Sequence, residues 1–212
     1  MPRPSTPPSS AQPRRVFDPL LRLLHWAIAL AIVSLIATSQ LADWFEHGPY
    51  EKTFWNLHIL SGYVLTAGLV TRLLWGLVGP ASARWRDLWH PAAWKDTLRN
   101  MRLPKTHRAG HDPIASLGYL FAYGVMAFMV VTGLGLAASE FQAGPLAGWL
   151  GNAEWLEDVL GEPHEFGFVL MLGFIGLHLT ALVFHQWRGE RVAQSMVTGK
   201  QYHHVESGVP HD

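Results

Sequence analysis

Residues 162–187 read EPHEFGFVLMLGFIGLHLTALVFHQW, an apolar run of membrane-spanning length that contains three histidines, His164, His178 and His185. Imidazole is costly inside a bilayer, so an ionisable residue in a transmembrane segment points by default to a functional site. His164 and His178 are 14 positions apart, which places both on one face of an α-helix at levels about 21 Å apart. One helix with two ligands at two depths predicts two metal centres stacked across a membrane.

Three further segments reach the length of about 20 residues that spans the hydrocarbon core of a bilayer. The four expected spans are residues 20–42, 55–78, 114–138 and 166–187. The predicted fold is therefore an all-α integral membrane protein, a bundle of four transmembrane helices. The expected domains are a disordered tail at 1–15, the membrane domain at 16–190 and a polar C-terminal tail at 191–212.

The lysines and arginines fall on one side of these spans. Of the 16 such residues, all except Lys52 lie in the two tails, in the second connection or at the adjoining helix ends. The positive-inside rule then places both termini in the cytoplasm. The opposite loops are acidic, and they could either dock a basic redox protein or simply follow the topology rule. We also expect a short helix near 149–160 in the second of these loops.

The chain has 212 residues, zero formal net charge and no cysteine. The absence of cysteine excludes disulfides, thiolate-bound iron–sulfur clusters and the covalent attachment of c-type haem. A haem in this chain would be held by its ligands and its pocket alone. We expect membrane lipid around the spans and no nucleic-acid partner.

Histidines on two other spans lie at about the same two depths as His164 and His178. His58 lies at the outer end of its span, as His164 does, and His25 lies near the inner end of the first span, at about the depth of His178. These pairs predict two b-type haems, each held by two histidines. Because iron with two axial imidazoles has no open position, such a centre transfers electrons and does not bind substrate. We therefore predict no catalytic residue, and an electron-transfer subunit rather than a stand-alone enzyme.

Four further residues are candidates for haem contacts. Gly62 and Gly167 lie within a turn of His58 and His164, where a missing side chain would let a flat macrocycle approach; plain helix packing is the alternative. Arg22 and Arg72 lie at the inner level, where a guanidinium could neutralise haem propionates.

Two alternatives remain at this point. His185 lies seven residues beyond His178 on nearly the same face and could replace it as the inner ligand, because depth does not distinguish them. A zinc or copper transporter is the chemical rival, since imidazole also suits those metals. Such a protein would need Cys, Met or carboxylates along a path, and the spans contain no Asp or Glu between their ends.

Several motifs resemble those of the bacterial cytochrome b561 family, which includes the cytochrome b subunits of nickel–iron hydrogenases. They are RVFDPLLRLLHW at 15–26, TRLLWGLVGP at 71–80, GHDP at 110–113, HEFGF at 164–168 and SMVTGK at 195–200. The likeness covers about residues 15–200. It implies a four-helix bundle with two b haems in the bacterial inner (plasma) membrane, and exchange of electrons with quinone. It also implies His25 with His178 as the inner pair and His58 with His164 as the outer pair, which favours His178 over His185.

The expected function is a di-haem cytochrome b that passes electrons across the membrane between quinone or quinol and a periplasmic redox protein. That partner would be a hydrogenase, another dehydrogenase or a cytochrome c. A free-standing quinone oxidoreductase that acts on a small oxidant such as superoxide is one alternative. A metal or haem transporter is another.

Overall fold

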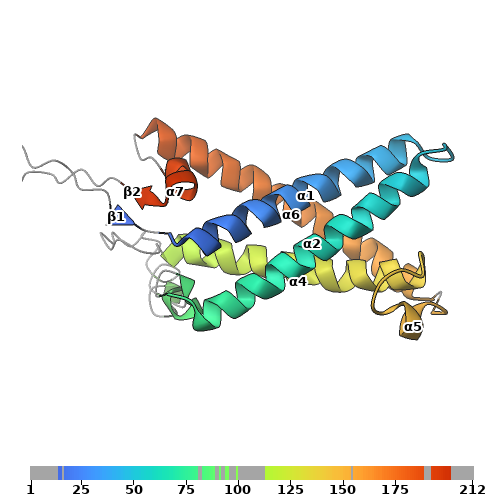
Figure 1. Ribbon diagram of the computed structural model, residues 1–212. Helices are drawn as coiled ribbons and strands as arrows, with labels where there is room; N and C mark the ends of the chain where they lie inside the picture. Colours follow the sequence, from blue (N-terminus) through green and yellow to red (C-terminus); the bar gives the residue numbers. More distant parts are fainter. Residues whose placement is uncertain are drawn as a thin grey trace, which may run out of the picture.

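Four long helices make up most of the protein (Figure 1). The computed structural model describes residues 14–15, 17–80, 83–88, 91, 94–95, 99, 113–153, 155–188 and 192–201. The long helices are α1 (Pro19–Trp44), α2 (Glu51–Val78), α4 (Pro113–Ser139) and α6 (Trp155–Trp187). The short elements are β1 (Arg14–Arg15), η2 (Trp85–Leu88), α5 (Ala147–Leu150), α7 (Val192–Thr198) and β2 (Lys200–Gln201).

Each long helix contains a stretch that is long and apolar enough to cross a membrane, so the four predicted spans are confirmed. Their outer faces are unusually apolar: Leu30, Val131 and Leu177 are 67%, 68% and 71% exposed. Water would make such surfaces costly, whereas lipid tails would not. The protein is therefore a multi-pass membrane protein.

The first helix begins where the sequence predicts. The Asp18 carboxylate accepts a hydrogen bond of 2.9 Å from the backbone N–H of Leu21, and Pro19 occupies the first turn. This is the usual N-cap arrangement, in which a side-chain oxygen satisfies a free N–H and proline costs no hydrogen bond. The Trp75 indole of α2 also donates to Asp18, at 3.3 Å. This bond ties together the ends of α1 and α2 that the charge rule predicts to be cytoplasmic, which we call the inner ends.

The fourth span differs from the expectation. Helix α6 begins at Trp155 instead of 166 and continues through Pro163, and only the single turn of α5 precedes it. The helix expected near 149–160 is thus mostly the first part of α6. Glu157 and Asp158 in the first turn favour that start, because carboxylates stabilise a helix N-terminus. Pro163 costs one backbone hydrogen bond inside the helix.

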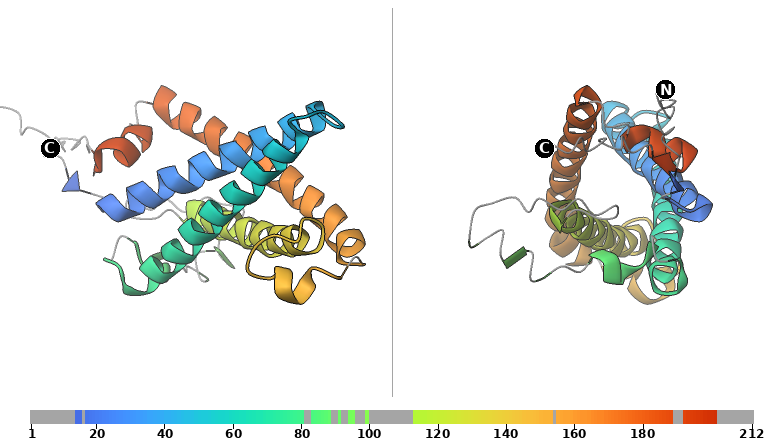
Figure 2. Two further views of the ribbon diagram at one scale, coloured as in Figure 1. Left: turned by 45° about the vertical axis from the view of Figure 1, so that its right-hand side comes forward. Right: turned by 90° about the vertical axis from the view of Figure 1, so that its left-hand side faces the viewer.

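The helices form two pairs that stand side by side. Viewed along the bundle, α1, α2, α4 and α6 follow one another around a ring (Figure 2). Helix α1 packs along α2, α4 packs along α6, and α2 touches α4. Among the described residues, α6 packs closely against neither α1 nor α2. The helices that carry each candidate histidine pair are therefore held apart by their neighbours.

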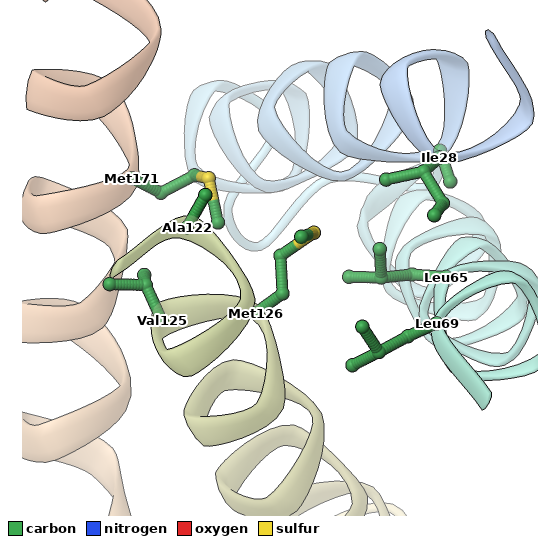
Figure 3. Packing of buried hydrophobic residues seen from close by; sticks show 8 residues of the cluster. Ile28, Leu65, Leu69, Ala122, Val125, Met126 and Met171 are labelled. Atoms are coloured by element: carbon green, nitrogen blue, oxygen red, sulfur yellow. The ribbon is translucent and has the colours of Figure 1, made fainter. Parts of the chain in front are cut away.

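An apolar layer fills the middle of the bundle. Ala122 and Val125 of α4 lie beside Met171 of α6, and Met126 of α4 points toward Leu65 and Leu69 of α2 (Figure 3). Met171 is midway along the chain between His164 and His178. This layer therefore lies between the two predicted levels.

The N-terminal and C-terminal segments meet at the inner end. Arg14 and Arg15 pair antiparallel with Gln201 and Lys200 as β1 and β2, and α7 packs beside the end of α6. Part of each predicted tail thus has regular structure; the remainder of both tails lies outside the described residues. So does most of the second connection, residues 82–108, in which an interfacial helix was one of two interpretations.

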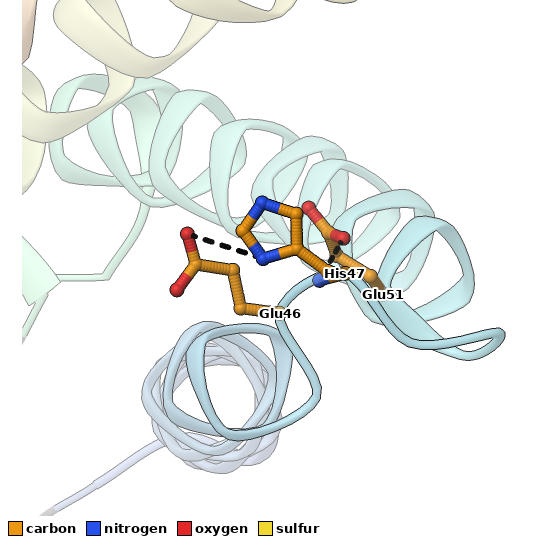
Figure 4. Close-up of polar contacts among 3 residues, drawn as sticks. All are labelled: Glu46, His47 and Glu51. Carbon is orange, nitrogen blue, oxygen red and sulfur yellow. Dashed lines mark hydrogen bonds and ion pairs between the residues drawn. The ribbon is translucent and has the colours of Figure 1, made fainter.

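The first outer loop is a tight turn (Figure 4). The backbone N–H of His47 donates to the Glu51 carboxylate at 2.8 Å, and His47 Nδ1 is 3.9 Å from Glu46. The His47 side chain is 87% exposed and its φ is +62°. His47 is therefore a surface residue of a turn, as the sequence predicts.

Candidate haem-binding site

His58 of α2 is anchored to α1. Its ring Nδ1 lies 3.0 Å from the backbone oxygen of Leu35 and 3.3 Å from the hydroxyl of Thr38. A carbonyl oxygen only accepts, so Nδ1 must carry the proton and donate. The Nε2 atom is then left with a free lone pair, which is the arrangement of a metal-ligating histidine whose other nitrogen is held by the protein.

His164 of α6 is anchored in the same way to α4. Its Nδ1 lies 2.8 Å from the Thr132 hydroxyl, which itself lies 2.9 Å from the backbone oxygen of Phe128. A hydroxyl that donates to that carbonyl accepts from Nδ1–H of His164. In that tautomer, Nε2 of His164 keeps a free lone pair that could ligate iron.

The ring of His164 is also fixed by a close contact. A Cβ added to Gly133 would lie 3.1 Å from Cε1 of His164, so only glycine leaves the ring its present position. Gly135 of the same helix also allows a close contact, because Leu160 fills the space that its Cβ would occupy. At Gly118 and Gly124 a Cβ would meet no atom within 4 Å.

The inner histidines are held differently. The ring of His25 meets that of Trp26 edge to face, with centroids 5.5 Å apart, and the ring of His178 stacks on Phe174 at 5.9 Å. Among the described side chains and carbonyls, none forms a hydrogen bond with either of these imidazoles. The inner rings are therefore oriented by aromatic contacts.

The structure brings the four histidines together in two couples. His25 and His178 are near enough to interact electrostatically, and so are His58 and His164. All four rings are partly buried, and each couple joins two helices that do not pack closely on one another. An imidazole from each side, with the backbones held apart, fits a flat macrocycle with two axial ligands.

Two buried hydrogen-bond donors suit the propionate groups of a haem. The Nε atoms of Arg22 and Arg72 are buried and bond to no partner among the described atoms. The rest of each guanidinium is engaged: Arg22 donates to the backbone oxygen of Val197 at 2.6 Å, and Arg72 lies 4.8 Å over the Trp85 ring. An unpaired buried donor is unfavourable, and a propionate would satisfy it.

The two glycines that were predicted to contact haem, Gly62 and Gly167, lie in different surroundings. A Cβ at Gly167 would collide with Met129 and lie 3.1 Å from Phe128, so its small size serves packing of α6 on α4. At Gly62 a Cβ would meet nothing within 4 Å, so no packing contact requires glycine there. The observations thus favour the packing alternative at Gly167, and a haem contact at Gly62 stays a prediction.

His185 lies in a different setting from His178. Its ring meets Phe184 edge to face at 6.1 Å, and the electrostatic neighbour of His25 is His178. In the part of the chain that the structure describes, no three His, Cys, Asp or Glu residues gather in a way that could hold a metal ion.

Sequence reasoning missed Thr38 and Thr132. Both lie within apolar spans, Thr38 on α1 and Thr132 on α4. Their only signal is a hydroxyl at about the depth of a histidine on another helix. That signal becomes specific only once helix pairing is known.

The inner end also contains a mostly apolar cavity of about 500 Å³ between α6 and α7, which is wide open to its surroundings. It is lined by Leu182, Val183, Gln186, Trp187, Ala193 and Gln194. Leu182 follows His178 by four residues, so the cavity begins about 6 Å further along the helix axis.

The outer end is acidic. Asp43 lies near enough to His58 to act on it electrostatically. At the end of α4, burial and the neighbouring Glu157 raise the pKa of the Glu140 carboxyl. The surroundings of the two couples therefore differ in the sign of their charge.

Known proteins resemble this chain over most of its length. The family described as prokaryotic cytochrome b561 matches residues 16–199. A probable Ni/Fe-hydrogenase B-type cytochrome subunit of Azotobacter chroococcum is 29% identical over 77% of this chain and 78% of its own. A probable Ni/Fe-hydrogenase 1 B-type cytochrome subunit of Escherichia coli is 26% identical over 89% and 90%. No solved structure matches the chain. The chain belongs to the prokaryotic cytochrome b561 family and is a b-type cytochrome of electron transport.

Proposed function

We propose that this protein is a di-haem cytochrome b that carries electrons across the bacterial inner membrane between quinone and a periplasmic redox partner. The observation that carries the proposal is that His25 lies within electrostatic range of His178, and His58 of His164, on helices that do not pack closely on each other. The chain has no cysteine, so the haems would be held without thioether bonds. When bound, haem iron would supply a one-electron carrier at each level.

Each residue has a separate part in this proposal. His58 and His164 hold the outer haem, and His25 and His178 hold the inner haem, all through Nε2. Protein anchors on Nδ1 keep the outer rings in that tautomer. The apolar layer around Met126 and Met171 keeps water from the space between the levels, so that electrons rather than protons pass.

We place the exchange of electrons with quinone at the level of the inner haem. The cavity between α6 and α7 is large enough for a small-molecule headgroup. Its walls are mainly apolar, but Gln186 and Gln194 supply amides that could bond to quinone oxygens. It lies beyond His178 toward the end of the bundle with the basic residues, where protons for quinone reduction are available from water.

A nickel–iron hydrogenase is the proposed partner on the outer side. The relatives named above carry that association in their names, and they match this chain over most of its length. Both termini would be cytoplasmic by the charge rule, so the acidic loops would face a periplasmic partner. Neither another dehydrogenase nor a cytochrome c has a comparable likeness in its favour.

The test uses single substitutions and a soluble quinol. His58→Ala should lose the outer haem, about half of the reduced α-band, and keep reduction of the remaining haem by quinol. His178→Ala should lose the inner haem and with it the reduction by quinol. If His178→Ala keeps both haems while His185→Ala loses one, the ligand assignment is wrong. If His58→Ala abolishes reduction by quinol and His178→Ala does not, the quinone side is wrong.

A further inference from the structure

The two levels differ in how their histidines are held. Nδ1 of each outer ring lies within hydrogen-bond distance of a fixed oxygen, 3.0 Å from the Leu35 carbonyl for His58 and 2.8 Å from the Thr132 hydroxyl for His164. His25 and His178 make only ring contacts among the described residues. The asymmetry is therefore one of hydrogen bonding, although the four side chains are of the same type.

This difference changes the ligand strength of the imidazoles. A hydrogen bond from Nδ1–H pulls the proton toward the acceptor and raises the basicity of the opposite nitrogen. A more basic Nε2 donates more charge to iron and stabilises the ferric state over the ferrous state. The outer iron should therefore be harder to reduce than the inner iron.

The charges around the two levels act in the same direction. The carboxylate of Asp43 acts on His58 at the outer end, and a nearby negative charge opposes the arrival of an electron. At the inner end, the buried guanidinium of Arg72 and that of Arg22, three residues before His25, favour it. The Arg72 guanidinium is buried, so its charge is weakly screened, whereas Asp43 is exposed and water screens its charge more strongly.

We propose that the Thr132 hydroxyl and the Leu35 carbonyl tune the outer centre to a lower reduction potential than the inner one, so that electrons run downhill from the outer face to the quinone side. Thr132 is then a positioning residue that acts through His164. The inference rests on the proposed di-haem function and adds the direction of electron transfer. One electron leaves the outer iron, which is oxidised, and reduces the inner iron; two such electrons and two protons convert a quinone to a quinol.

Redox titration of the purified, haem-loaded protein tests the inference. The titration of the wild type should show two components at different potentials, one for each haem. Thr132→Val removes the hydroxyl at nearly constant volume and should shift only the lower-potential component, toward positive potential. Thr132→Ser keeps a hydroxyl and should leave that component near its wild-type value. Thr71→Val is the matched control, because the Thr71 hydroxyl donates to Ala67 of its own helix at 2.7 Å; neither component should move.

A second variant assigns the components without relying on Thr132. His58→Ala should leave a single component, at the higher of the two wild-type potentials. If the remaining component is the lower one, or if Thr132→Val shifts the higher one or neither, the inference is overturned while the di-haem function stands. If Thr132→Val does not retain the outer haem, the potential of the single component that remains in His58→Ala tests the inference instead. A wild-type protein with one component and one haem would overturn the proposed function instead.

Discussion

At the scale of single residues, the histidines were predictable and their anchors were not. A 14-residue spacing in an apolar run is visible in sequence because it needs only the helical period. The bond from His164 to Thr132 joins α6 to α4, and the bond from His58 to Leu35 uses a backbone oxygen that any residue would supply. Such partners depend on which helices pair, so one-dimensional patterns do not contain them.

Gly133 supplies a prediction at this scale. Gly133→Ala places a Cβ 3.1 Å from Cε1 of His164 and should push the ring from its position. Overpacking of this kind costs about 1–3 kcal/mol, which corresponds to roughly 5- to 150-fold weaker retention of the outer haem. Haem content and the reduced α-band measure the effect.

Gly124→Ala is the matched control on the same helix, since its Cβ meets no atom within 4 Å. The control should keep both haems and the wild-type spectrum. Equal haem retention in the two variants would show that the Gly133 contact does not position His164.

At the scale of elements, the sequence did not predict the inner clasp, by which we mean α7 together with the paired strands β1 and β2. Two carbonyls near the end of α7 are capped by α1: Arg22 donates to Val197 at 2.6 Å, and Trp26 donates to Met196 at 3.3 Å. Helix ends leave such carbonyls unpaired. Seven residues are too few for an amphipathic period to predict this helix, and its cap comes from a segment about 170 residues away.

The clasp depends on the backbone at Gly199, whose φ is +73° and whose added Cβ would lie 3.2 Å from the Arg22 guanidinium carbon. Gly199→Ala should therefore cost about 1–2 kcal/mol from its backbone conformation alone. We expect roughly 5- to 30-fold faster amide hydrogen exchange in α7. Gly148→Ala, with open space around it, should leave that exchange unchanged. Full protection of α7 in Gly199→Ala would mean that the clasp does not need this conformation.

At the scale of the whole molecule, the number of spans followed from hydropathy, but their packing did not. In a soluble protein the buried face of a helix is apolar and the outer face polar, so a period marks the interior. Here lipid and interior are both apolar, and exposed residues such as Leu177 resemble buried ones such as Leu65 and Leu69 in composition. The pairing of α1 with α2 and of α4 with α6, and the separation of α6 from α1, come from the structure alone.

That separation is the feature on which the account depends, because a macrocycle needs two ligands with the backbones held apart at both levels. The most direct measurement is the amount of haem b per polypeptide in the purified wild-type protein. The account predicts two haems per chain, both with the low-spin spectrum of iron held by two imidazoles. One haem per chain, or a high-spin spectrum at either level, would contradict it.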